Sequence, residues 1–510
     1  MHRVGILVLV LSIVGFIQTS CIVEVVAFSP NIPHNSIRSS NTNISTKPNS
    51  CHSYGIRKVK RISLNSISEK VDDEALNNLL ESNNLRGAIN LLKNNGEATL
   101  DLDKSQIVNI FNAIERRTIE AEENNINKRM TDDVENQYPP SSPARMEMTS
   151  MYNALKSLDV LTVFGAASNA NYPAQGSKVI TSTLLEQITK LTMVSLTPQP
   201  TNTLLVAGAI FALAEGAFSV ATGISLNFII FLTLFLAFLD KLLVNGAVFE
   251  SITRVAMPEY NRKILKHEAG HFLVAYLLGC PVEGCVLNSW AALTDARFGG
   301  RRTTVSAGTS FFDPDLSDEI NGRKPLSRAS IDRYSVIVMG GIAAEALNFG
   351  RADGGAGDEA ALIGFLSNLK PRAGGAVTWD LPGIKNQARW GALQAVLLLK
   401  EYNVCYDALV EALEKGGDLG ECVFAIENAA RVHGLPGITK TPLGYIVNKG
   451  PYGEFVTTPP DENSSVSSGS ISKDQNDKMS LKDEVVSLED LKKKMQEKLK
   501  NIDSQLDKFQ

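Results

Sequence analysis

The sequence predicts a mainly α-helical protein with a small β element, divided into more than one module. Apolar residues recur at three- and four-residue spacing in several separate segments, which is the period of amphipathic helices. The region 282–306, in contrast, is short, β-prone and punctuated by glycine. A chain of 510 residues exceeds the size of a single core, so we expect two or three modules.

The first 70 residues have the composition of a targeting leader. Residues 1–27 have the basic Arg3 near their start, continue as an apolar run and end in small residues, as a signal peptide does. Residues 28–70 are rich in Ser, Asn, Arg and Lys and nearly free of acid, as a transit peptide is. The combination resembles the two-part leader of algae whose plastids descend from an engulfed red alga. A signal peptide followed by a disordered secreted linker is the alternative.

Residues 71–200 are predicted to form a helical N-terminal module. The stretches 72–95 and 104–124 have helical periodicity, and Gly96 separates them. A polar, proline-containing segment, 125–145, is predicted to be a linker before further helices. We expect this module to serve in packing and assign no chemistry to it.

Two apolar runs within 203–244 predict a transmembrane helical hairpin that turns at Gly223. The second run is the more apolar and approaches the length needed to cross a bilayer. Glu215 lies inside the first run, where a carboxylate is costly in lipid. A pair of core helices in a soluble protein is the alternative.

The segment 259–278 contains His267-Glu268-Ala269-Gly270-His271. Two residues four apart lie on one face of a helix, so both imidazoles can share one metal ion. In the His-Glu-x-x-His pattern the histidines bind Zn²⁺ and the glutamate accepts the proton of the attacking water. The pattern predicts a zinc site with His267 and His271 as ligands and Glu268 as the catalytic base. Two core histidines beside a capped glutamate are the structural alternative.

The run HEAGHFLVAYLLGCPVEG resembles the zinc-binding helix of the FtsH family of membrane-bound metallopeptidases. The segment 332–350, with its Gly-Gly-x-x-Ala-Glu pattern, resembles the second helix of that family. The resemblance then implies an acidic third zinc ligand in the run Asp-Gly-Gly-Ala-Gly-Asp-Glu, and we choose Asp358, with Glu359 as the alternative. Glu345 is expected either to orient a ligand histidine or to form a structural ion pair. A helical zinc-peptidase domain of FtsH type is therefore expected at 257–450.

The resemblance implies a zinc metalloendopeptidase that hydrolyses peptide bonds of plastid proteins, with a zinc-bound water as nucleophile. The Gly-x-x-x-x-Gly-Lys-Ser/Thr run of an ATPase is missing from the sequence, so the closest likeness is to plastid FtsH-like proteins without a motor. Expected partners are protein substrates, a thylakoid or envelope membrane, and a separate ATPase or FtsH-type protein. The alternatives are a catalytically silent membrane-associated scaffold and a zinc enzyme that acts on a small amide.

Charge and cysteine content exclude two other classes of protein. Residues 1–70 hold eight basic and two acidic side chains, which leaves 42 basic and 53 acidic ones in the remainder. A nucleic-acid-binding protein is expected to be basic, so no nucleic-acid partner is predicted. The six cysteines are too few for a disulfide scaffold, and those outside the leader are predicted to be reduced thiols.

The C-terminal part is predicted to lie outside the folded domain. Residues 451–480 are rich in Ser, Pro, Asp and Asn, which predicts a disordered linker. In 481–510, apolar residues recur at three- and four-residue steps among Lys and Glu. This pattern predicts an amphipathic helix or a short coiled coil.

Overall fold

The structure is a computed structural model, and it describes the helical body of the chain. The two predicted leader segments and the predicted C-terminal helix lie outside the described residues. The chain divides into two compact units after Pro459, and every described residue belongs to the first of them. The described ranges are 73–94, 102–131, 142–168, 180–198, 203–299, 307–324, 327–369, 379–435, 437–441, 449–450 and 453–454.

The N-terminal helices confirm the helical prediction but correct two boundaries. The predicted stretch 72–95 is broken at Asn83, whose φ of 54° cannot continue a helix. The helix from Lys104 continues into the predicted linker, because no Gly or Pro interrupts the polar sequence there, and the next helix already begins at Pro143. These helices are α2 (Asp73–Glu81), α3 (Leu85–Asn94), α4 (Lys104–Thr131), α5 (Pro143–Ser157) and α6 (Ser182–Thr189).

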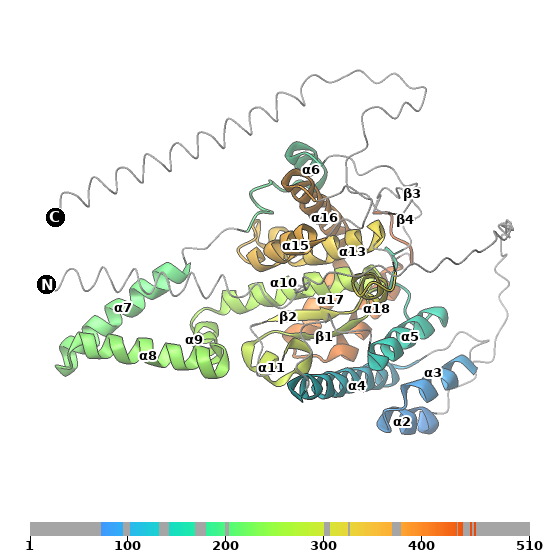
Figure 1. Ribbon diagram of the computed structural model, residues 1–510, viewed down its shortest axis with the longest axis horizontal. Coiled ribbons are helices and arrows are strands. Elements are labelled where there is room, and N and C mark those ends of the chain that lie inside the picture. The colour runs from blue at the N-terminus through green and yellow to red at the C-terminus, as the bar shows by residue number, and fades with distance from the viewer. Residues whose placement is uncertain are drawn as a thin grey trace, which may run out of the picture. The chain divides into compact units, whose positions relative to one another are not determined.

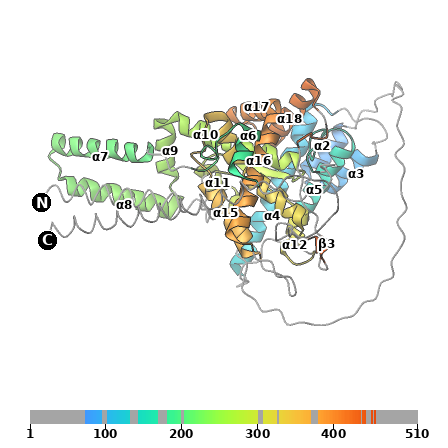
Figure 2. The same cartoon turned by 90° about the horizontal axis from the view of Figure 1, so that it is seen from above.

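Helices α7 (Thr203–Thr222) and α8 (Leu226–Val244) lie side by side in both views (Figures 1 and 2). Within the described part of the chain, α8 is the one helix long and apolar enough to cross a membrane, and it has no buried residue. In α7 only the shorter apolar stretch 208–222 qualifies as an apolar helix. The Thr233 hydroxyl donates a 2.5 Å hydrogen bond to the buried Glu215 carboxylate, so the acid of α7 faces α8.

The region after α8 is a bundle of helices around α10. The predicted helix at 332–349 is in fact two helices that meet at Met339, and Tyr402 separates α16 from α17. The helices are α9 (Ala247–Ala256), α10 (Pro258–Leu277), α11 (Ser289–Thr294), α12 (Pro314–Ile320), α13 (Arg328–Val338), α14 (Gly340–Phe349), α15 (Ala356–Asn368), α16 (Leu381–Glu401), α17 (Asn403–Glu414) and α18 (Leu419–His433).

A two-stranded antiparallel sheet lies beside α10, where the sequence predicts a small β element. Strands β1 (Val282–Val286) and β2 (Gly308–Phe311) pair with Val286 opposite Gly308. The segment after β2 contains α12, because the Asp313 carboxylate accepts hydrogen bonds from the first backbone N–H groups of that helix. A second short hairpin joins β3 (Lys449–Gly450) to β4 (Gly453–Glu454).

One hydrophobic core connects the N-terminal helices to the bundle. It extends from Leu76 in α2 to Ala430 in α18, and the C-terminal half of α10 is buried within it. Polar contacts cross the same boundary: Arg145 of α5 forms an ion pair with Glu283 of β1, whose side chain is nearly inaccessible. The predicted helical module and the predicted peptidase region therefore pack around a common core.

A buried carboxylate, Glu427 of α18, fixes α10 to the segment after α5. It accepts hydrogen bonds from the Thr162 backbone N–H at 2.7 Å, the Thr162 hydroxyl at 2.7 Å and the Val163 N–H at 3.2 Å. The Tyr276 hydroxyl of α10 donates a fourth at 2.6 Å. A charge this deeply buried is tolerated only when such donors surround it.

We expect Glu427→Ala to lower the free energy of unfolding by about 3 kcal/mol, because it leaves several buried donors without an acceptor. Urea unfolding of the full chain in mild detergent measures the change. The exposed neighbour Asn428 supplies the control, and Asn428→Ala should change the stability by less than about 0.5 kcal/mol. Equal effects of the two substitutions would contradict the role assigned to Glu427.

Candidate metal centre

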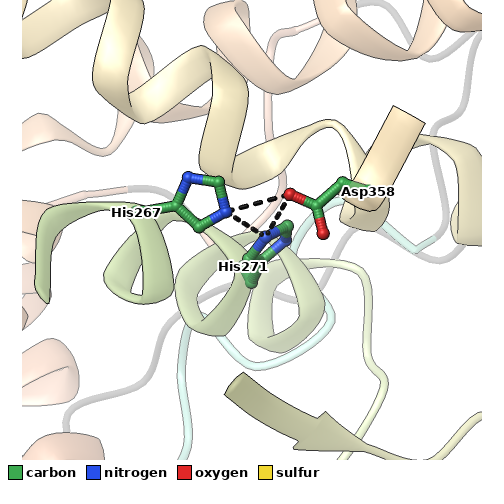
Figure 3. Close-up of side chains that lie close together, drawn as sticks. All are labelled: His267, His271 and Asp358. Carbon is green, nitrogen blue, oxygen red and sulfur yellow. Dashed lines mark hydrogen bonds and ion pairs between the residues drawn. The ribbon is translucent and has the colours of Figure 1, made fainter. Parts of the chain in front are cut away.

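Helix α10 positions the two histidines of the His-Glu-x-x-His pattern. It begins at Pro258, where a proline needs no hydrogen-bond partner for its nitrogen, and the chain leaves it through Gly279 at a φ of 78°. Its C-terminal half is buried in the core, so the helix is held firmly at the level of the motif. His267 and His271 lie on one face of it, as their spacing predicts (Figure 3).

The structure brings Asp358 to these two histidines from 91 residues farther along the chain. Asp358 lies in the first turn of α15, and its Oδ2 is 2.9 Å from His267 Nε2 and 3.4 Å from His271 Nε2. The two Nε2 atoms are 3.0 Å apart (Figure 3). Three potential ligand atoms from two helices therefore converge on one point.

This spacing fits a tetrahedral zinc ion. Ligand atoms about 2.0–2.1 Å from Zn²⁺ in tetrahedral geometry lie roughly 3.3 Å from one another. Two imidazole nitrogens and one carboxylate oxygen are also a donor set that zinc accepts, with one coordination position left over. Among the residues that the structure describes, these three form the one cluster of metal-binding side chains found.

The other nitrogen of each imidazole has its own partner, which fixes the orientation of each ring. His267 Nδ1 lies 2.7 Å from Glu345 Oε1, and His271 Nδ1 lies 2.8 Å from the carbonyl oxygen of Ile337. The second oxygen of Glu345 accepts hydrogen bonds from the backbone N–H groups of Asp353 and Gly354. Glu345 therefore contacts a proposed ligand histidine and also holds the loop that precedes α15, as a carboxylate behind a metal-binding histidine does.

The charges at this site favour a cation. Burial lowers the pKa of His267, but its contacts with Asp358 and Glu345 outweigh this and raise that pKa well above its ordinary value. Burial alone would raise the pKa of Asp358, yet the two imidazoles hold that pKa well below its usual range. The carboxylates therefore stabilise positive charge between the rings, whether protons or a metal ion supply it.

The side chain of Glu268 lies on the side of α10 that faces the sheet of β1 and β2. This side chain is buried, and its Oε2 accepts a 2.9 Å hydrogen bond from the hydroxyl of Thr309 in β2. Burial raises the pKa of this carboxyl, an effect that the nearby imidazoles oppose. Thr309 cannot be predicted from the sequence as a partner of Glu268, because no local pattern shows that β2 lies beside the motif.

Small residues allow α10 and α14 to approach closely. A Cβ added to Gly270 would lie 2.5 Å from the Gly340 carbonyl oxygen and 2.7 Å from Ala344 Cβ. A Cβ added to Gly341 would lie 2.3 Å from His267 Nε2. The space above Gly341 is therefore occupied by the imidazole of a proposed ligand.

We expect Gly341→Ala to lower zinc affinity strongly while the protein remains folded, because the new methyl group displaces the His267 ring from its position near Asp358. Titration with a competing chelator measures the affinity. Gly216 is a matched control, since a Cβ added there meets nothing within 4 Å, and Gly216→Ala should leave zinc affinity unchanged. Unchanged affinity in Gly341→Ala would contradict the placement of His267.

The remaining predicted candidates are not members of the cluster. Glu359, the alternative third ligand, does not belong to it. Cys280, Cys285, Cys405 and Cys422 are free thiols, as predicted, and none joins the cluster. Arg297 forms ion pairs with Asp295 and Glu115.

Comparisons of the chain with protein-family models, with curated proteins and with solved structures give no match.

Proposed function

We propose that this protein is a zinc-dependent metalloendopeptidase. The observation that carries the proposal is the convergence of His267, His271 and Asp358 on one point, with Glu268 on the same helix between the two histidines. The two rings and the carboxylate would hold Zn²⁺, and Glu345 and the Ile337 carbonyl would keep the rings oriented. When bound, zinc supplies Lewis-acid chemistry that polarises a scissile carbonyl and activates water at neutral pH.

The proton transfers fall to Glu268. Its carboxylate takes the proton of the attacking water and delivers it to the leaving amine nitrogen, so that the peptide C–N bond breaks to give a carboxylate and a free amine. Thr309 steadies one carboxylate oxygen through its 2.9 Å hydrogen bond. The other carboxylate oxygen of Glu268 is then the one that accepts the proton of the attacking water.

A peptide substrate is supported by the strand beside the site. Among the described residues, β2 pairs only with β1, and Thr309 on β2 contacts Glu268 directly. An extended peptide that adds to the edge of this sheet would place its backbone close to the proposed zinc. This arrangement favours a protein substrate over a small amide.

We also propose that the protein acts at a plastid membrane on plastid proteins. The composition of the leader supports the plastid, and α8 supports the membrane because it is apolar throughout and has no buried residue. The phosphate-binding motif Gly-x-x-x-x-Gly-Lys-Ser/Thr of an ATPase is missing from the sequence. A separate ATPase or FtsH-type partner would therefore unfold the substrates.

Incubation of the purified full chain with an unfolded protein tests the proposed activity. We expect internal cleavage that a chelator stops and that added zinc restores, because the proposed reaction requires the metal. Cleavage that continues in chelator would contradict a zinc peptidase. Failure to cleave any unfolded protein when zinc is bound would favour the silent scaffold instead.

A further inference from the structure

Helix α9 carries polar residues toward the protein and apolar residues away from it. Glu250 is buried and Arg254 is largely covered, whereas four apolar side chains on the opposite side are between 47% and 85% exposed. These four are Val248, Phe249, Ile252 and Val255. A helix on the surface of a soluble protein has the reverse arrangement, with its apolar face on the core. The outward face of α9 is therefore an apolar surface that the described part of the chain leaves uncovered.

A polar network holds α9 in this orientation. Glu250 accepts a 2.7 Å hydrogen bond from Arg254 Nε and a 2.8 Å bond from the Ser289 backbone N–H. Arg254 also donates to the carbonyl oxygen of Leu287 and to the side chain of Asn261. Rotation of the helix to bury its apolar face would break all of these contacts and leave Glu250 without them.

The apolar face of α9 begins where the candidate membrane span α8 ends. Asp240 of α8 accepts hydrogen bonds from the backbone N–H groups of Val248, at 3.0 Å, and Phe249, at 2.9 Å. Asn245 and Gly246 between the helices adopt left-handed conformations, which make a tight turn. The angle between α8 and α9 is thus fixed by hydrogen bonds and by backbone conformation.

Trp290 provides a second, independent indication, because it belongs to α11. Trp290 is 46% exposed, while its Nε1 donates a 3.0 Å hydrogen bond to the Ser251 hydroxyl of α9. A tryptophan with an outward ring and a satisfied N–H group is typical of the boundary between membrane and water.

We propose that α9 and Trp290 lie on a phospholipid bilayer, with the four apolar side chains of α9 in the boundary between headgroups and acyl chains. The proposal rests on the membrane location of α8 and is independent of peptide cleavage.

The proposed contact also places the metal centre close to the membrane surface. His267 is nine residues beyond Pro258, the first residue of α10, so about 14 Å of helix separates it from the end of α9. Substrate segments at the membrane surface are therefore within reach of the site.

Tryptophan quenching in liposomes tests this contact. The full chain is reconstituted in phosphatidylcholine whose acyl chains carry bromine either near the headgroup or near the bilayer centre. The emission of Trp290 is obtained by subtracting the spectrum of Trp290→Phe. We expect shallow bromine to remove most of this emission and deep bromine to remove much less.

Two reporters in the Trp290→Phe background separate the contact from the span itself. Phe235→Trp, at the middle of α8, should be quenched most by deep bromine, and Val432→Trp, on α18, should not be quenched. Deep quenching at position 235 without quenching of Trp290 would overturn the α9 contact and leave the span standing. Quenching at neither position would overturn both, and cleavage of a soluble unfolded protein would be unaffected. Concentration-dependent dimers that shield an unquenched Trp290 would assign the face to a second copy and also overturn the proposal.

Discussion

We expect Glu268→Gln to lower the rate of peptide cleavage by about 10³-fold or more, while zinc stays bound. The amide has the same shape as the carboxylate and can keep the Thr309 hydrogen bond, but it cannot accept the proton of the attacking water. The proposed ligands His267 and His271 are unchanged, so the metal site remains complete. Cleavage kinetics and elemental analysis of the same preparation measure the two effects.

Glu259 is the matched control for this substitution, because it is exposed and lies in the first turn of the same helix. Glu259→Gln should cleave at the unsubstituted rate. Cleavage by Glu268→Gln at the rate of Glu259→Gln would remove Glu268 from the mechanism. Loss of zinc from Glu268→Gln would instead give this residue a structural role.

Replacement of Asp358 by alanine is expected to reduce zinc affinity by more than about 100-fold, the upper range for loss of an outer partner of a metal ligand. Asp358 Oδ2 lies within 3.4 Å of both Nε2 atoms, so its removal takes away a donor and also the charge that balances the cation. Competition with a chelator of known affinity measures the change.

Glu359 is the adjacent acid in the first turn of α15, and it separates the effect of a ligand from the effect of local charge. Glu359→Ala removes the same charge but no atom of the cluster, so zinc affinity should remain within a few-fold of the original. A larger loss in Glu359→Ala than in Asp358→Ala would show that the third ligand is Glu359.

The part of the site that lies on one helix can be predicted from the sequence. The four-residue spacing of His267 and His271 places both imidazoles on one face, and the structure shows this arrangement. Asp358 could be chosen only through the resemblance to FtsH peptidases, because periodicity relates neighbours within a helix and not residues 91 positions apart. For the same reason the sequence does not relate Glu345 to His267, whereas in the structure its Oε1 lies 2.7 Å from His267 Nδ1.

Other features depend on tertiary contacts that the sequence does not show. Periodicity predicts a helix at 72–95, and the family resemblance implies one at 332–349. Each of these stretches is two helices, because a left-handed residue at Asn83 and a junction at Met339 interrupt them. The segment α9 has a helical period, but only the structure shows that its polar side is the buried one. Likewise, nothing local in the sequence pairs Glu427 with Tyr276.

The proposed zinc centre is tested most directly by anomalous scattering at the zinc absorption edge from crystals of the full chain. A single zinc ion held by these ligands predicts one anomalous peak within about 2.0–2.2 Å of His267 Nε2, His271 Nε2 and a carboxylate oxygen of Asp358. A peak at any other position, or no peak at these three residues in crystals grown with zinc, would contradict the proposed metal centre.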